Sequence, residues 1–343
     1  MSKGIVFRLT GTLSLIVFIF CKGNSQDLQV PSVRLMFYNA ENLFDIYDDT
    51  LKNDNDFLPG GVMRWNFTRY NRKINSLYKT IIAAGEWDPP AVVALCEIEN
   101  RKVLEDLLFR TSLLKFDYGI LHEDSPDERG IDVSLIYRKD VVKIIFYRYW
   151  NPRGSGKDVL KTRNILYAKC LIHKDTVHLF ANHWPSRRGG VLAGESLRME
   201  IAELVRNKVD SIAATDPSGE KIIIAGDFNC SPEDPVMKIL TGTAGSGVKL
   251  VNLSDTLSDE GLGSYRYAGT WEMIDQVIVS DWLLKSGSGL SADMGSFRIF
   301  EAEFLLKSDP KYAGSRPFST YLGYRYQGGF SDHLPVLLDL MLR

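Results

Sequence analysis

Short apolar runs that end in a polar side chain recur along the chain. The clearest run begins at Ile222, where four apolar residues precede Gly226 and are followed by Asp227 and Asn229. A continuous apolar run of this length is typical of a strand buried on both faces. Asp227 and Asn229 occupy alternate positions, so their side chains leave the backbone on the same side. The pattern predicts a buried strand with two oxygen donors at its end.

The same periodicities predict the remaining elements. We expect further strands at 33–39, 91–96, 131–137, 141–149, 165–172, 176–182, 273–279, 297–306 and 336–340, and helices at 69–84, 103–108 and 195–212. Many strands with few intervening helices favour an α/β (α+β) fold of two stacked mixed sheets flanked by helices. A parallel doubly wound sheet fits less well, because too many strands lack a crossover helix.

The first residues have the pattern of a targeting segment. Lys3 and Arg8 precede a largely apolar stretch from Leu9 to Phe20, and small residues follow at Gly23 and Ser25. This order predicts a cleaved signal peptide at 1–25 and export from the cell. A transmembrane anchor is the alternative, but the apolar stretch is shorter than the roughly 20 residues that span a bilayer. We therefore expect no stable membrane insertion. Since no long linker follows, 26–343 should form one domain.

Charge and cysteine usage narrow the classes of function. Lys and Arg total 41 and Asp and Glu total 43, which excludes a general nucleic-acid coat protein, because that class needs a strong basic excess. Any polyanionic substrate must be held locally. Cys96, Cys170 and Cys230 would remain after cleavage and have neither disulfide nor zinc spacing. We interpret them as small core residues.

Carboxylate, carboxamide and histidine side chains lie at or near the ends of six predicted strands. An isolated Asp–His pair is more often part of a turn, but six such strand ends are hard to dismiss. Loops at one end of a sheet often carry binding and catalytic groups. The set comprises Asn39, Glu97, Asn182 with His183, Asp227 with Asn229, Asp275, and Asp332 with His333.

This ordered set resembles the endonuclease/exonuclease/phosphatase superfamily, the group that includes deoxyribonuclease I. The resemblance runs from Val33 to Leu340, and its most specific parts are Gly-Asp-Phe-Asn at 226–229 and Ser-Asp-His at 331–333. It implies a four-layer α/β sandwich that hydrolyses phosphodiester or phosphomonoester bonds with Mg²⁺ or Mn²⁺. Two features stand apart: Cys96 replaces the usual Gln before the metal-binding Glu, and the segment at 182–187 is similar to a bacterial secreted branch.

A divalent cation needs carboxylate oxygens at this end of the fold. Mg²⁺ is typically held by one or two protein carboxylates, several waters and substrate phosphate. Glu97 is the best first ligand, with Asn39, Asp227 and Asp332 around it. We also expect Asp227 to take part in catalysis. The cation would polarise a phosphoryl oxygen and stabilise the leaving oxyanion.

Two histidines are the candidates for proton transfer and phosphate contact. We expect His333 to exchange a proton with the attacking water, oriented by Asp275 through a hydrogen bond. His183 would contact the scissile phosphate from the other side, with Asp132 as its partner. Asn229 would place the water or bind a phosphate oxygen.

Substrate binding is assigned to basic and amide side chains near these histidines. Arg187 and Arg129 are the expected phosphate contacts, because guanidinium groups match phosphate oxygens, and Asn39 would assist them. Aromatic and basic residues alternate at 265–271 and 321–326. These stretches could stack nucleic-acid bases or could be packed loops whose hydroxyls reach water.

Three functions are compatible with the sequence. The first is an exported, metal-dependent phosphodiesterase that acts on DNA or RNA, as a monomer. The second keeps the mechanism but acts on a phospholipid head group, sphingomyelin or a sugar phosphate. The third is a non-catalytic interaction protein on the same fold, which the intact Glu97, Asp227, His183 and His333 disfavour.

Overall fold

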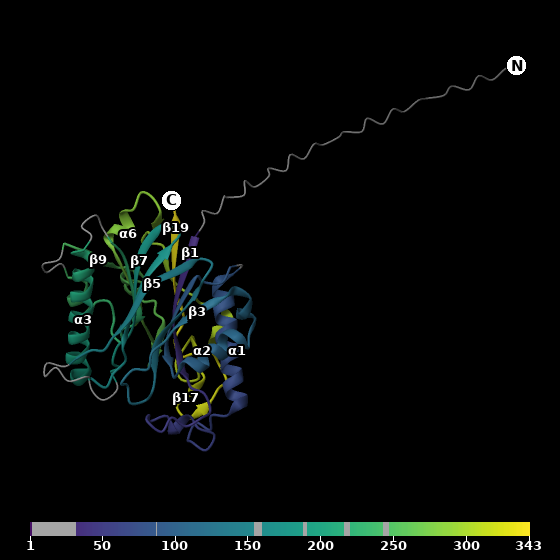
Figure 1. Ribbon diagram of the computed structural model, residues 1–343. Helices are drawn as coiled ribbons and strands as arrows, with labels where there is room; N and C mark the ends of the chain where they lie inside the picture. Colours follow the sequence, from purple (N-terminus) through teal and green to yellow (C-terminus); the bar gives the residue numbers. More distant parts are fainter. Residues whose placement is uncertain (2–31, 87, 154–159, 188–190, 216–219, 243–246) are drawn as a thin grey trace.

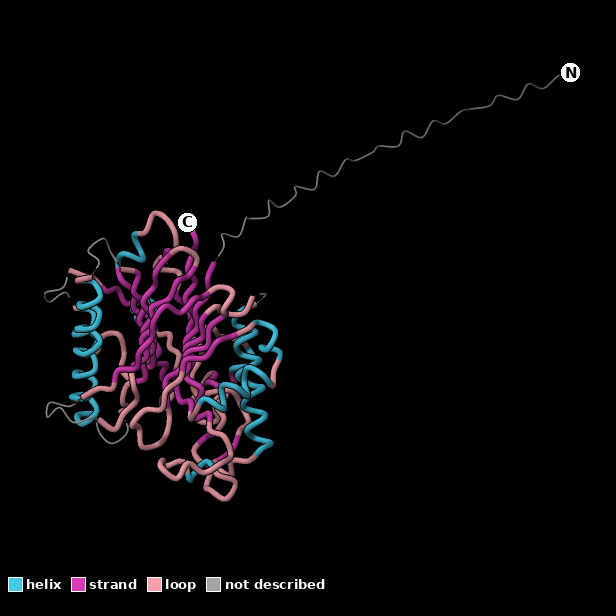
Figure 2. Tube along the Cα trace, viewed as in Figure 1, coloured by secondary structure: helices cyan, strands magenta, loops and turns pink. Residues whose placement is uncertain are grey.

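The computed structural model of the protein has four layers. Two β-sheets lie face to face, and helices cover the outer face of each (Figures 1 and 2). Within the described part of the chain, no helix combines the length and apolar character needed to cross a membrane. The predicted signal peptide lies, apart from Met1, outside the described residues. These are Met1 and 32–86, 88–153, 160–187, 191–215, 220–242 and 247–343.

The first sheet contains seven strands. They are β1 (Ser32–Leu43), β2 (Val92–Ile98), β3 (Tyr118–Leu121), β4 (Asp132–Arg138), β13 (Leu290–Ser291), β14 (Phe297–Ile299) and β19 (Val336–Leu342). Their order is β13-β19-β1-β2-β4-β3, with β14 also paired to β19. Only β1 and β2 run parallel among these pairs, so the sheet is mixed.

The second sheet contains six strands. They are β5 (Val142–Trp150), β6 (Ile165–Ile172), β7 (Asp175–His183), β8 (Lys221–Asp227), β9 (Leu250–Asn252) and β12 (Asp275–Ser280). Their order is β5-β6-β7-β8-β12-β9. β7 and β8 are parallel and the other neighbours are antiparallel.

Helices close both outer faces. α1 (Phe67–Gly85) and α2 (Arg101–Phe109) cover the first sheet, and α3 (Val191–Ala213) and α4 (Pro235–Thr241) cover the second (Figure 1). The side chain of Asn66 caps α1 by accepting hydrogen bonds from two backbone N–H groups. The remaining short helices are α5 (Asp255–Asp259), α6 (Asp281–Lys285), η1 (Asn55–Phe57), η2 (Ser112–Phe116) and η3 (Glu303–Leu305).

Strand β8 shows how the sequence pattern produces the layers. Ile223 packs between the sheets, whereas Ile222 and Ile224 pack beneath α3 and α4. Both faces of the strand are therefore buried, as its apolar run predicts. At its end, a Cβ on Gly226 would lie 2.7 Å from the Cβ of Asn182 on β7. Glycine thus permits the close approach of the two parallel strands beside the site.

One predicted strand is wrong. Residues 297–306 form β14, then η3, and reach β15 (Leu306–Ser308) only at the last position. β14 pairs with β19, whereas β15 pairs with β16 (Ser315–Pro317) in a separate hairpin. The apolar residues of 297–306 therefore belong to two short strands that pair with different strands. The other small hairpins are β10 (Tyr265–Tyr267) with β11 (Thr270–Glu272) and β17 (Tyr321–Leu322) with β18 (Arg325–Tyr326).

The topology gathers the polar strand ends at one end of the sandwich. Asn39 of β1 stands beside Cys96 of β2, and His183 of β7 stands beside Asp227 of β8. Asp275 begins the antiparallel strand β12 directly opposite Asp227. Because the two sheets face each other, the donors from both converge.

Candidate active site

His333 and Asp275 form the most closely coupled pair of the site. His333 Nδ1 lies 2.7 Å from Asp275 Oδ2, and the hydroxyl of Ser264 donates to the same oxygen. The ring of Tyr265 lies over the imidazole, with centroids 4.9 Å apart. Burial lowers the pKa of His333, but Asp275 and two further carboxylates outweigh it and raise the pKa well above its usual value. The surrounding carboxylates therefore favour the protonated form of the His333 imidazole.

Asn39 and Asp227 join the two sheets. Asn39 Nδ2 donates to Asp227 Oδ2 at 3.0 Å and lies 3.4 Å from His333 Nε2. Asn39 Oδ1 accepts the backbone N–H of Glu41 at 2.9 Å. Burial first, and then repulsion from Asp275, raises the pKa of Asp227. The structure thus brings Asn39, Asp227, Asp275 and His333 together.

His183 enters the same space from the end of β7. Its Nε2 lies 3.7 Å from Asp227 Oδ2 and 4.0 Å from Glu97 Oε1. Burial, followed by the positive charges of two nearby arginines, lowers the pKa of His183 well below its usual value. The surroundings therefore favour the neutral imidazole at His183 and the protonated one at His333. Opposed pKa shifts of two neighbouring groups are the arrangement that separates acid and base roles.

Glu97 and Asp332 supply further carboxylate oxygens. Glu97 Oε2 accepts the backbone N–H of Asn42 at 2.8 Å, and Asp332 Oδ1 lies 3.9 Å from His333 Nε2. Burial and the negative charge of Glu97 raise the pKa of Asp332, against the opposing charge of His333. Carboxylates that repel one another in this way suit a hard divalent cation, whose charge would relieve the repulsion. Among the described residues, the close donor groups join Asp227 with Cys96 and His183, and with Asp275 and His333. A cation held by Glu97, Asp332 and Asp227 therefore stays a prediction.

Cys96 lies beside this carboxylate set. Cys96, His183 and Asp227 each place one donor atom within 4.8 Å of the others. Burial raises the pKa of the Cys96 thiol well above its usual value, so the thiolate form that metals bind is disfavoured. Cys96, Cys170 and Cys230 are all free and buried, in agreement with their interpretation as core residues.

The backbone around the site is strained. Non-glycine residues in left-handed conformations cost about 1–3 kcal/mol each and cluster at functional sites. Asn229 is held by its backbone N–H, which donates to Asp227 Oδ1, and by its amide, which donates to the Trp184 carbonyl, each at 3.0 Å. The residues with this conformation at the site are Glu41 (φ 50°), Asn42 (φ 58°), Glu97 (φ 60°) and Asn229 (φ 51°).

Lys73 of α1 lies behind the site and is 1% exposed. Its Nζ donates to Thr320 Oγ1 and to the Phe330 carbonyl, both at 2.5 Å, and lies 3.9 Å from Glu41 Oε2. Glu41 in turn accepts two backbone N–H groups of the same loop. Because Phe330 closely precedes the Ser-Asp-His segment, Lys73 helps to fix the loop that delivers Asp332 and His333.

The expected pairing of His183 with Asp132 is wrong. Asp132 Oδ1 accepts the backbone N–H of Ser125 at 2.9 Å, and its Oδ2 lies 3.4 Å from His122 Nε2. His183 Nδ1 is buried and has no hydrogen-bond partner among the described residues. The loop between β3 and β4 therefore engages the carboxylate of Asp132. A catalytic role for Asp132 stays a prediction.

The two predicted phosphate-binding arginines differ in their surroundings. Arg187 forms an ion pair with Glu272 and has a side chain that is 43% exposed. Arg129 is exposed, and its charge contributes to the lowered pKa of His183, which places it near the site. Their contacts with substrate remain predictions.

The aromatic and basic stretch at 265–271 is the hairpin of β10 and β11; Arg266 is packed within the chain, whereas Tyr267 is 64% exposed, so base stacking stays a prediction. The guanidinium of Arg266 donates to the carbonyls of Gly269, Ala313 and Ser315 and to Asp309. Its hydrogen-bonding capacity is therefore used within the chain. Tyr265 covers His333, so this stretch supports the catalytic pair.

Sequence reasoning missed several supporting residues. Lys73 carried a weak signal, since it stands four positions before Leu77 on the apolar side of its helix. Ser331 lay inside the quoted Ser-Asp-His segment; its hydroxyl donates to the Asn39 carbonyl at 2.7 Å and accepts the His333 N–H. Arg163, which donates to the Trp184 carbonyl, had no signal.

Fold and site together define a class. Two stacked mixed sheets carry a His–Asp pair, a second histidine and a carboxylate set suited to a divalent cation, which is the equipment of phosphoester hydrolases. The chain belongs to the endonuclease/exonuclease/phosphatase family, whose model matches residues 34–342. It is therefore an enzyme of the hydrolase class that acts on phosphoester bonds.

Solved structures share the fold at low identity. An endonuclease/exonuclease/phosphatase family protein from Bacteroides thetaiotaomicron is 15% identical with a TM-score of 0.56, covering 92% of this chain and 99% of that one. D. rerio TDP2 complexed with single-strand DNA product is 16% identical with a TM-score of 0.55, covering 90% and 98%. A Bacteroides thetaiotaomicron mannosyl-6-phosphatase is 15% identical with a TM-score of 0.55, covering 90% and 99%. A comparison with curated proteins found no match.

Proposed function

We propose that the protein is an exported, divalent-cation-dependent phosphodiesterase that hydrolyses DNA or RNA. One observation carries the hydrolytic part: His333 Nδ1 lies 2.7 Å from Asp275, while its Nε2 lies 3.4 Å from Asn39 Nδ2 beside Asp227. An imidazole held in this way by a carboxylate has one nitrogen left for proton exchange with water. The nucleic-acid part is supported by the D. rerio TDP2 structure, which contains a single-strand DNA product.

Each residue has a distinct part in the proposed reaction. Asp275 fixes the orientation of His333, and the neutral form of His333 accepts a proton from the attacking water at Nε2. Neutral His183 offers Nε2 to a phosphoryl oxygen, and Asn229 helps to place the water. Glu97, Asp332 and Asp227 would hold the cation, which when bound would polarise a phosphoryl oxygen and stabilise the leaving oxyanion.

A sugar or lipid phosphate is the second candidate substrate, and one flank of the site favours it. Burial first, and then the negative charges of three neighbouring aspartates, raise the pKa of Glu99 to about 8. An acidic flank repels a long polyanion more than a compact phosphate. The acidic loop beside Glu99 contains Asp45, Asp48, Asp49, Asp54 and Asp56.

A substrate panel tests the proposal. The metal-stripped chain is supplied with Mg²⁺ or Mn²⁺ and offered plasmid DNA, RNA, sphingomyelin, mannose 6-phosphate and bis(4-nitrophenyl) phosphate. Arg34→Met, at the opposite end of β1, is the matched control for His333→Ala. The proposal requires cleavage of DNA or RNA that is lost in His333→Ala and kept in Arg34→Met. Turnover of only the sugar phosphate or sphingomyelin would move the function to the second candidate.

Export is tested separately. Mass spectrometry of the protein from the producing cell should find a chain that begins near Gln26 outside the cytoplasm. An intact chain from Met1 inside the cell would contradict export and leave the hydrolase proposal untouched.

A further inference from the structure

A second group of metal-ligating side chains lies at the base of the hairpin formed by β3 and β4. His122 and Asp124 follow β3, and Asp132 begins β4. One donor atom from each of the three lies within 4.8 Å of the others. Among the described residues this group shares no member with the proposed active-site cation set.

The buried imidazole of His122 has carboxylate neighbours, but its Nε2 is without a hydrogen bond among the described residues. Its side chain is 3% exposed, and its Nε2 makes no hydrogen bond within the described chain. Leaving a buried polar atom without a hydrogen bond destabilises the folded state. A metal ion bound at Nε2 would remove this cost, because neutral imidazole nitrogen is a common metal ligand.

The spacing of His122 and Asp132 matches two ligands of one ion. His122 Nε2 lies 3.4 Å from Asp132 Oδ2. Ligands that are about 2.0–2.1 Å from a tetrahedral ion are roughly 3.3–3.4 Å apart. The other oxygen of Asp132 is fixed by the Ser125 N–H at 2.9 Å, which orients the carboxylate as a supporting hydrogen bond commonly does for a metal ligand.

Asp124 is the solvent-exposed member of this group. Its side chain is 76% exposed, and its Oδ1 lies 3.9 Å from His122 Nδ1, on the other ring nitrogen from the one that faces Asp132. The donor-atom spacing of the whole group, within 4.8 Å, is what includes Asp124 as the third ligand. An ion could therefore enter from solvent and keep water ligands. One imidazole and two carboxylates favour Mn²⁺ or Zn²⁺, whereas Ca²⁺ and Mg²⁺ prefer sites made of oxygen alone.

We propose that His122, Asp124 and Asp132 bind a divalent transition-metal ion of the Mn²⁺ or Zn²⁺ class, at a site separate from the proposed catalytic cation. The ion ties together both ends of the 122–131 loop, which reduces the freedom of that loop. Lys52 already holds the same loop through the carbonyls of Ser125 and Asp127. The loop carries Arg129, so the ion steadies a residue near His183. The site itself does not rest on the proposed function, but the expected total of two ions in the test includes the proposed catalytic cation.

Counting bound ions tests the proposal without any activity measurement. The full chain is stripped with a chelator, dialysed against Mn²⁺ or Zn²⁺, and its bound ions are counted by mass spectrometry. Wild type should bind two ions per chain, and Glu97→Gln and His122→Gln should bind one each. The double variant should bind none. Asp117→Asn, an exposed carboxylate that precedes β3, is the matched control and should bind two.

Asp124→Asn separates loss of a metal ligand from misfolding, because this exposed side chain contributes little to packing and the variant should fold. Calorimetric titration should show one of the two ions weakened by at least about tenfold, as expected on loss of a ligand. A stoichiometry of two in His122→Gln, with unchanged affinities in Asp124→Asn, would overturn the proposal. A wild-type stoichiometry of one that is lost in Glu97→Gln would also overturn it and reduce the group to an ion pair.

Discussion

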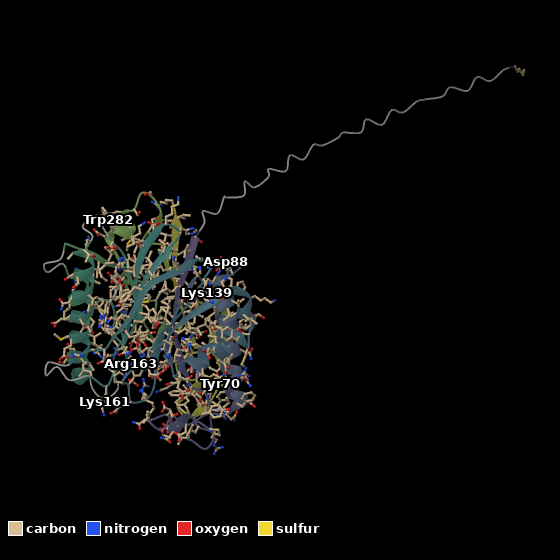
Figure 3. All side chains as sticks on the ribbon, in the orientation of Figure 1. Tyr70, Asp88, Lys139, Lys161, Arg163 and Trp282 are labelled. Atoms are coloured by element: carbon tan, nitrogen blue, oxygen red, sulfur yellow. The ribbon has the colours of Figure 1, made fainter. Side chains whose placement is uncertain are left out.

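Strands β1 and β19 lie side by side. The carboxylates at one end of this strand pair have arginine partners, whereas those near the other end have histidine partners. At one end, Arg34 donates two hydrogen bonds to Asp339, at 2.6 and 3.1 Å, and Arg298 contacts the same carboxylate. At the other end, Asp227 and Asp275 are buried, and their ion-pair contacts within the described chain are with histidine alone. Figure 3 labels Asp88 and Lys139 toward the first end and Arg163 toward the second.

We interpret the carboxylate at the first end as part of the fold and the carboxylates at the second end as part of the proposed site. At the Arg34 end, hydrogen bonds to two arginines lower the pKa of Asp339, against the opposing effect of burial. At the His333 end, burial and mutual repulsion raise the pKa of Asp227. The chain pairs the first carboxylate with arginines, whereas the second receives hydrogen bonds from Asn39 and the Asn229 N–H and has only histidines as ion-pair neighbours among the described residues. Four residues with positive φ lie at this second end, in keeping with strain held for function.

The largest effect should follow from removal of His333. His333→Ala should lower kcat/KM about a thousandfold, since general acid–base groups contribute roughly 10²–10⁴. Arg34→Met should leave kcat/KM within about twofold, because it lies at the opposite end. Steady-state kinetics on the preferred substrate of the panel measure both. Equal losses of kcat/KM in the two variants would contradict the assignment of catalysis to the His333 end.

Asp275→Asn should change both the rate and its pH dependence. We expect kcat/KM to fall about tenfold to a hundredfold. In wild type, activity should rise with pH through a limb above the usual histidine pKa of about 6.5, because the carboxylates raise the pKa of His333. Loss of the Asp275 charge lowers that pKa, so the limb should move to lower pH. A pH–rate profile in which the limb stays in place would contradict this assignment.

Lys73→Met should destabilise the fold by about 3 kcal/mol, because it leaves Glu41 buried without its cation. Chemical denaturation measures the loss. Lys102→Met is the control, since Lys102 forms a surface i,i+4 pair of the kind that is worth about 0.3–0.5 kcal/mol. Lys73→Met should also weaken Mn²⁺ binding, because the loop with Asp332 loses an anchor. Two variants of equal stability would contradict the supporting role of Lys73.

The smallest effect should be that of Arg34→Met, about 1–2 kcal/mol at pH 7. The pKa of Asp339 is lowered in the folded state, so its contribution is present above the usual aspartate pKa of about 3.9 and is lost as pH falls through the lowered value. The stability difference between wild type and variant should therefore shrink in acid. Denaturation at pH 7 and pH 3 measures the change. A difference that stays constant would show that Arg34 acts through packing.

The sequence predicts those features that depend on residues close together in the chain. Apolar runs such as 222–225 and their polar ends lie within a few residues, so the strands and their donors could be read from the sequence. The partners of buried charges are not local. Asp132 bonds the loop at 122–125 instead of His183, and Lys73 reaches Thr320 across 247 residues. At 297–306, β14 pairs with β19 of the first sheet and β15 pairs with β16 in a hairpin, and the local apolar pattern does not show where one pairing ends and the other begins.

The most direct test follows turnover against cation concentration in metal-stripped wild type and Glu97→Gln. The account predicts no cleavage of the preferred phosphodiester without cation. Activity should return in wild type with Mg²⁺ or Mn²⁺, and Glu97→Gln should need at least about tenfold more cation. Turnover by stripped wild type, or identical cation curves for the two proteins, would contradict a cation-assisted reaction at Glu97, Asp227 and Asp332.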